Sequence, residues 1–151
     1  SWVSVEFKLY LIKEFQRLKE TEYQQLGWDI RRNLARINYR IHTYAIKETL
    51  IPPSVTKAQA GHVYASEADL LNVALFGQTA KQWRDNHPDT EGNQRDQATL
   101  EQLVVLTNLE SLNAVFIRQG LAAPERLLKL NEIAITQMRS LLADHYIKRL
   151  T

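Results

Sequence analysis

The apolar positions of this chain recur at spacings of three and four, which is the periodicity of a helix buried on one side. Residues 4–20 carry two neighbouring stripes of this kind, formed by Val5, Leu9 and Ile12 and by Leu11, Phe15 and Leu18. Residues 29–50 continue with a third set, formed by Ile30, Leu34, Ile37, Ile41 and either Tyr44 or Ala45. No segment alternates apolar and polar residues between turn signals, so we predict an all-α protein.

Glycine and proline divide the pattern. Gly27 falls between the first two helical stretches, and we predict a break or kink there, giving helices over about 4–25 and 29–50. Pro52 and Pro53 end the second helix because neither can donate a backbone hydrogen bond and Pro53 disfavours helix at the residue before it. Residues 52–63 are therefore expected to be a linker.

Capping residues mark the remaining helices. Ser66 and Asp69 predict a short helix that stops at Gly77, and Thr79 begins another over residues 80–86. Thr99 and Gln102 form a complete capping-box pattern ahead of a long apolar helix that runs to Gln119. A last helix begins at Pro124. The expected core is formed by Leu103, Leu106, Leu109 and Phe116, packed by Leu130, Ala134 and Met138.

The expected architecture is thus an extended N-terminal pair of helices followed by a compact orthogonal helical bundle over about 64–146. We divide the chain into a first helix (1–26), a connecting helix (27–51), the linker (52–63) and a C-terminal helical domain (64–151).

Several long phrases resemble one known family. The run from Trp2 to Lys19, WVSVEFKLYLIKEFQRLK, is similar to the final helix of the KilA-N domain, a DNA-binding module of phage and bacterial proteins. From about Trp28 to Leu142 the chain resembles the region that follows KilA-N in bacterial proteins, through Ile37-Asn-Tyr-Arg-Ile-His42, Tyr64 to Gly77, Thr79 to Arg84 and Leu130 to Ile135. The resemblance implies that residues 1–26 close a domain whose earlier part precedes Ser1. It also implies a phage- or prophage-type transcription regulator that contacts DNA mainly through that earlier part.

Composition narrows the class of protein. The chain has 151 residues, 44% of them hydrophobic and 24% charged, which is typical of a globular domain. It has no cysteine, which excludes disulfides and thiolate sites and fits a cytoplasmic protein. No apolar run approaches the roughly 20 residues of a membrane span, and no leader pattern is present, so no membrane partner is expected.

The sequence contains no recognisable catalytic or metal-binding motif. The histidines at 42, 62, 87 and 145 have no metal-ligand spacing, and we interpret His42 as a packed or surface residue. Acidic pairs such as Glu67 with Asp69 lie at expected caps and loops, where carboxylates stay solvated. There is no nucleophile motif and no glycine-rich phosphate loop. We therefore expect no catalytic residue, cofactor or metal, and not an enzyme.

The most specific polar feature is a stripe of arginines spaced by four residues, Arg32, Arg36 and Arg40. This spacing places the three guanidinium groups on one helix face, where they could contact successive DNA phosphates. The alternative is that they pair with acids of the middle segment, such as Asp69, Asp85 or Glu101. Residues 61–110 hold three Lys/Arg against eight Asp/Glu, whereas residues 1–60 hold ten against six.

The N-terminal helices also predict self-association. Phe7, Leu11 and Phe15 would be exposed without an earlier domain to cover them, and apolar patches of that size seldom remain in water. We expect a homodimer or larger oligomer with residues 1–50 at the interface. The expected function is an oligomerisation and interaction region of a KilA-N-type regulator, and the alternative is a helical module that contacts DNA phosphates itself.

Overall fold

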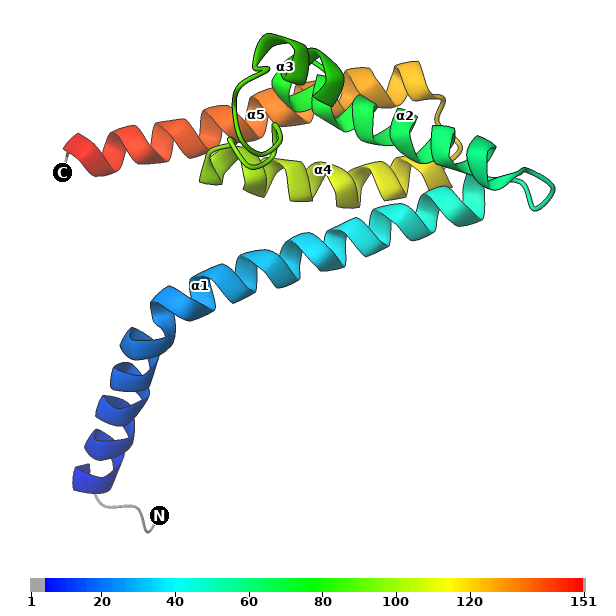
Figure 1. Ribbon diagram of the computed structural model, residues 1–151. Helices are drawn as coiled ribbons and strands as arrows, with labels where there is room; N and C mark the ends of the chain where they lie inside the picture. The colour runs from blue at the N-terminus through cyan, green and yellow to red at the C-terminus, as the bar shows by residue number, and fades with distance from the viewer. Residues whose placement is uncertain (1–4, 151) are drawn as a thin grey trace. The chain divides into compact units, whose positions relative to one another are not determined.

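The computed structural model describes the backbone of residues 5–150 and the side chains of residues 8–18 and 32–143 (Figure 1). Its helices are α1 (Val5–Thr49), α2 (Lys57–Phe76), α3 (Ala80–Asn86), α4 (Leu100–Arg118) and α5 (Ala123–Leu150). No strand occurs in the described part of the chain, so the all-α prediction is confirmed. The chain forms two compact units, Ser1–Arg36 and Ile37–Thr151, which are described separately below.

Helix α1 is continuous from Val5 to Thr49. Of the predicted break or kink near Gly27, the break is wrong, because residue 27 is helical. A glycine costs a helix only about 1 kcal/mol relative to alanine, which the long flanking segments tolerate. The predicted end before Pro52 is confirmed, since Leu50 is a turn residue that closes on Ile46 O at 2.9 Å.

Helix α2 begins earlier than the sequence pattern indicated. The segment assigned to a linker over residues 52–63 is helical from Lys57 onward, and Ser66 lies inside the helix instead of capping it. The cap is Thr56, whose Oγ1 accepts a hydrogen bond from Gln59 N at 3.2 Å while Gln59 Oε1 accepts one from Thr56 N at 2.9 Å. The end at Gly77 is as predicted, with a left-handed φ of 76°.

The caps of α3 and α4 follow the same Thr-x-x-Gln pattern, and both were predicted from the sequence. Thr79 pairs with Gln82, and Thr99 pairs with Gln102, each through two reciprocal hydrogen bonds. Three capping boxes therefore set the starts of three helices of the second unit.

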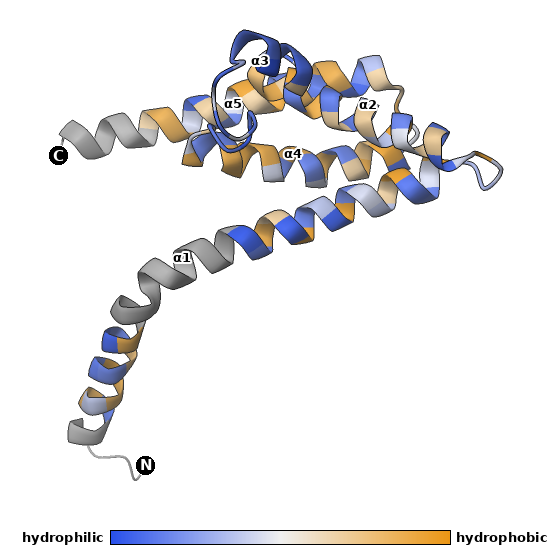
Figure 2. Cartoon of the chain, in the orientation of Figure 1, coloured by the Kyte–Doolittle hydropathy of each residue, from blue (hydrophilic) through white to orange (hydrophobic). Residues whose placement is uncertain are grey.

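The core of the second unit lies between α2, α4 and α5, which run alongside one another in Figure 1. Its fully buried members are Leu71, Ala74, Val105, Leu106, Leu109, Leu130 and Ala134. The predicted burial of Leu106 and Leu109 is confirmed, and Leu130 and Ala134 pack on them as expected. Leu103, Phe116 and Met138 are only half-buried. Figure 2 shows the contrast with α3 and the loop after it, which are largely hydrophilic.

Helix α4 is the only described helix that is long and apolar enough, by length and composition alone, to cross a membrane. The central helix of a packed bundle has the same composition, and α4 takes that place here, with Leu109 and Ile117 almost completely buried.

Candidate functional site

The part of α1 that belongs to the second unit packs one face against the bundle. His42, Ala45 and Ile46 are buried there, with exposed fractions of 5% or less, and Asn38 is half-buried one turn earlier. Asn38 Nδ2 donates to Thr107 O at 2.7 Å, and Ala45 and Ile46 pack against Ala114 and Ile117 of α4. These contacts fix the end of α1 on α4.

The apolar set identified in the sequence lies on the remaining surface of α1. Ile37 is 53% exposed, Ile41 43% and Tyr44 55%, at spacings of four and three. Leu34, three residues before Ile37 on the same helix, is also 53% exposed, whereas Ile30 lies outside the described side chains. The helix therefore keeps this apolar stripe exposed while it buries a mixed face of His42, Ala45 and Ile46.

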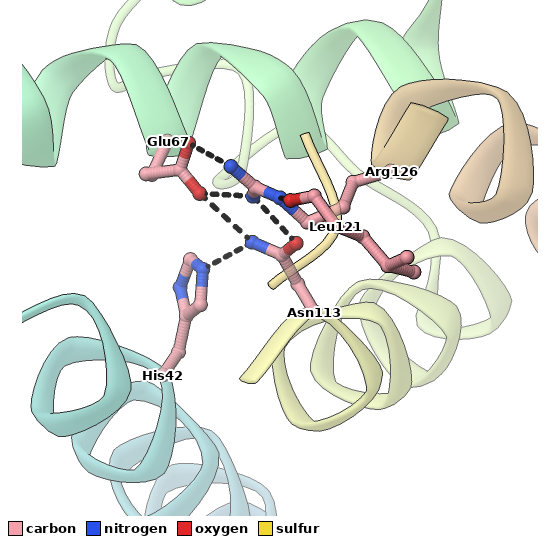
Figure 3. Close-up of polar contacts among 5 residues, drawn as sticks. All are labelled: His42, Glu67, Asn113, Leu121 and Arg126. Carbon is pink, nitrogen blue, oxygen red and sulfur yellow. Dashed lines mark hydrogen bonds and ion pairs between the residues drawn. The ribbon is translucent and has the colours of Figure 1, made fainter. Parts of the chain in front are cut away.

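Four helices contribute to a buried polar network behind that face (Figure 3). Arg126 of α5 forms a two-pronged ion pair with Glu67 of α2, through Nη1 to Oε1 and through Nη2 to Oε2 at 3.2 Å. Arg126 Nη1 also donates to Asn113 Oδ1 at 2.9 Å, and its Nε donates to Leu121 O at 3.0 Å. Asn113 Nδ2 lies 2.7 Å from His42 Nε2 and 3.3 Å from Glu67 Oε1.

The network fixes the tautomer of His42. Arginine only donates, so the Asn113 atom that faces Arg126 must be the carbonyl oxygen, and the atom that faces His42 is then the donating amide nitrogen. His42 Nε2 must accept, and the proton of the neutral ring lies on Nδ1. Burial lowers the pKa of His42 from 6.5 to about 4, against the opposing effect of Glu67 and with smaller contributions from Arg126 and Arg95.

The network holds the fold and offers no obvious chemistry. Glu67 is ion-paired and His42 is neutral, and among the described side chains no nucleophile is hydrogen-bonded to either of them. Removing one member of such a buried pair usually costs about 3–5 kcal/mol because the other charge is left uncompensated. The four residues therefore tie α1, α2, α4 and α5 into one arrangement.

Sequence reasoning did not find this network. It placed Glu67 at a solvated cap, but Glu67 lies inside α2 and is buried. His42 was interpreted as packed or surface, and the structure shows the packed alternative. Residues 42, 67, 113 and 126 are far apart along the chain, so spacing carries no signal of their contact.

The candidate phosphate contacts Arg32, Arg36 and Arg40 are all exposed on α1. Arg40 is the member that lies in the second unit, and within the described side chains of that unit it forms no ion pair with Asp69, Asp85 or Glu101. The buried or half-exposed acids Glu110, Glu48 and Glu67 pair instead with arginines of the bundle and its loops. The structure therefore does not support the alternative that Arg40 pairs with an acid of the middle segment.

The described side chains of the first unit are almost all exposed. Its large apolar residues, at 47–67% exposure, are Leu9, Tyr10, Leu11, Ile12, Phe15 and Leu18. This agrees with the expectation for Leu11 and Phe15, and Phe7 lies outside the described side chains.

No group of three or more His, Cys, Asp or Glu residues within the described part of the chain is arranged to hold a metal ion. Comparisons with protein-family models, with curated proteins and with solved structures found no match for this chain.

Proposed function

We propose that this chain is the interaction and oligomerisation region of a DNA-binding regulatory protein of the KilA-N type, and that two copies pair along α1. The resemblance of residues 2–19 to the last KilA-N helix supports the class of protein. On this proposal, a preceding part of the intact regulator makes most of the contacts with DNA in the cytoplasm.

The observation that carries the pairing is the exposed stripe of Leu34, Ile37, Ile41 and Tyr44 on α1. Its spacing of three, four and three is that of the seam between two paired helices. The neighbouring face of the same segment is already used, since His42, Ala45 and Ile46 are buried against the bundle. A two-fold dimer would bring the stripe of one copy onto the stripe of the other and remove both from water.

The alternative is direct contact with DNA phosphates through Arg32, Arg36 and Arg40. It is favoured by the exposure of all three side chains on one helix and by the lack of an ion pair for Arg40 within the described second unit. The two functions are compatible, because the arginines and the apolar stripe are different residues of α1.

Sedimentation at tens of micromolar protein tests the pairing. We expect the wild-type chain to be a dimer and Ile41→Glu to be a monomer with unchanged helix content, since Ile41 is exposed and its replacement leaves the core intact. The matched control is Leu128→Glu on α5, where the leucine is 69% exposed and lies outside the stripe. A monomeric wild-type chain, or equal dissociation by the control, would refute pairing along α1.

A further inference from the structure

The second unit contains a cavity of about 230 Å³, and His42 is one of the residues that line it. It lies between α1, α2, the start of α3, α4 and the loop that follows α3. Apolar walls come from Ala68, Leu71 and Leu106, and polar groups come from His42, Gln94 and Glu110 among others. At roughly 30 Å³ per molecule it has room for about eight waters. That is the size of a small ring compound.

The loop that forms one wall of the cavity is held in place by its own hydrogen bonds. Arg84 donates to three carbonyls of the loop, His87 O at 3.1 Å, Thr90 O at 2.7 Å, and Gly92 O. Asn93 and Asp96 exchange two further bonds, Asn93 N to Asp96 Oδ2 at 2.8 Å and Asp96 N to Asn93 Oδ1 at 2.9 Å. The wall that carries Gln94 is therefore formed before any molecule enters.

Two acceptors in the cavity lining lack donors. Gln94 is 6% exposed, and its Oε1 is the only buried side-chain N or O atom of the described residues that has no hydrogen-bond partner. Glu110 is 2% exposed and accepts from Arg95 Nη2 at 2.7 Å through Oε1, whereas Oε2 receives no hydrogen bond from the described residues. Burial raises the pKa of Glu110 in spite of Arg95. A buried acceptor without a donor is costly, so Gln94 Oε1 favours a molecule that brings an N–H group. Glu110 Oε2 is free to accept a second hydrogen bond.

One donor lies among the same lining residues. Because Asn113 holds the Nε2 of His42 as an acceptor, the Nδ1–H of the neutral ring is the free donor, and it has no partner among the described residues. His42 lines the cavity. The polar network thus fixes a donor on a side chain that lines the cavity.

The charges of the lining cancel. Glu110 is paired with Arg95, Glu67 behind the cavity is paired with Arg126, and His42 is neutral. A charged molecule would find no free counter-charge, whereas a neutral one would lose little solvation on entry.

We propose that this cavity binds a neutral amino-substituted heteroaromatic ring of nucleobase size. The amino group donates to Gln94 Oε1 and Glu110 Oε2, a ring nitrogen accepts from His42 Nδ1–H, and the ring lies against Leu71 and Leu106. The site is independent of pairing along α1, because it uses the buried face of that helix.

Titration of the full chain with adenine and with cytosine, followed by two-dimensional NMR, tests the site. We expect saturable shifts of His42, Leu71 and Leu106 signals at millimolar or lower concentration of at least one of the two. Purine, which lacks the amino group of adenine, should bind about tenfold or more weakly if adenine is the base that binds, because the buried Gln94 Oε1 stays without a donor. Gln94 also borders a second pocket lined by Trp83 and His87. Shifts confined to Trp83 and His87 would overturn the proposal.

The variant Gln94→Met separates binding from stability. Since Gln94 Oε1 has no partner in the empty protein, replacing the amide by a thioether of similar size should keep or raise the melting temperature while binding falls about tenfold or more. Gln119→Met is the control, because Gln119 is exposed and outside the cavity, and it should leave binding unchanged. Failure of both bases to bind the folded wild-type chain, or undiminished binding by a folded Gln94→Met variant, would sink the proposal.

Discussion

At the scale of single residues, His42 takes its protonation state from side chains on other helices. Asn113 donates to its Nε2, and Asn113 is itself oriented by Arg126. A proton added to the ring would break that hydrogen bond and leave a charge in a buried place. The pKa of His42 is accordingly lowered to about 4 by burial.

The lowered pKa of His42 should make the stability of the protein depend on pH. Above pH 6.5 the ring is neutral in both the folded and the unfolded chain. As the pH falls from 6.5 towards 4, the unfolded chain binds a proton that the folded chain refuses, so stability is lost. Over this window we expect His42 to reduce the free energy of unfolding by about 3 kcal/mol, measured by urea unfolding at a series of pH values.

The comparison with His42→Gln isolates this contribution, since Gln keeps an acceptor for Asn113 but does not titrate. Glu110 acts in the opposite direction, because its pKa is raised by burial and its protonation favours the folded state as the pH falls. Glu110 is present in both the wild-type chain and the His42→Gln variant, so its contribution cancels in the comparison. His62→Gln, at an exposed position, should retain the full wild-type slope. A His42→Gln variant with the same slope as wild type would show that His42 does not cause it.

Little of this residue-scale chemistry follows from the sequence. Asn113 lies on a helix whose apolar residues dominate its pattern, and Glu67 follows Ser66 where a helix start was expected. Hydrogen-bond partners separated by 46 to 71 residues leave no periodic trace, so the network becomes visible only when the helices are packed. The arginine stripe was easy to find because its members are neighbours on one helix.

At the scale of elements, local signals predicted most helix ends. Thr79 with Gln82 and Thr99 with Gln102 mark starts that depend only on hydrogen bonds within four residues. Thr56 with Gln59 has the same signature, but the two prolines just before it favoured a linker. The predicted N-cap of α2, Ser66, was therefore wrong by ten residues. The sequence left the continuity of α1 through Gly27 open between a break and a kink, because a glycine weakens a helix without ending it.

Helix α4 should dominate the stability of the bundle. Leu106→Ala removes a side chain that is 3% exposed in the core cluster with Leu71 and Leu130, and it should lower the free energy of unfolding by about 2–5 kcal/mol. Leu128→Ala is the matched control, since Leu128 is 69% exposed on α5, and it should change stability by no more than about 0.5 kcal/mol. Chemical denaturation of both variants checks this. Equal losses would mean that the buried face of α4 is assigned wrongly.

At the scale of the whole molecule, α1 belongs to both units and carries the candidate surfaces for a partner. The part within the second unit has one face on the bundle, an apolar stripe at Ile37, Ile41 and Tyr44, and Arg40 exposed. The sequence indicated the stripe and the arginines. It did not show which face the bundle would cover, because apolar spacing alone predicts burial of the stripe and not of the polar side.

The arginines give a prediction for nucleic acid. If Arg32, Arg36 and Arg40 each contact one phosphate, binding of duplex DNA should show little sequence preference. The slope of log K against log salt should be about −2.7 for one chain, at roughly 0.9 per contact, and twice that for a dimer that presents both stripes. Changing all three to Gln should remove most of the binding without loss of helix content, since Gln has a good helix propensity. Fluorescence anisotropy over a range of salt concentrations measures the slope.

A second triple-Gln variant with the same change in net charge controls for non-specific attraction, and it uses the exposed residues Lys57, Lys81 and Arg139. Its salt slope should stay near the wild-type value. Absence of DNA binding by the wild-type chain would leave the arginine stripe without this role and would place the DNA contacts of the intact protein elsewhere.

The buried ion pair has a consequence for synthesis. Arg126 is the last of the four network residues to be made, after His42, Glu67 and Asn113. Until α5 emerges, closing α2 and α4 over Glu67 would enclose a carboxylate that has no cation, at a cost larger than the apolar contacts available by then can easily offset. We therefore expect the second unit to fold only once its final helix has been made, and a nascent chain that stalls before Arg126 to be more sensitive to proteases than the finished chain.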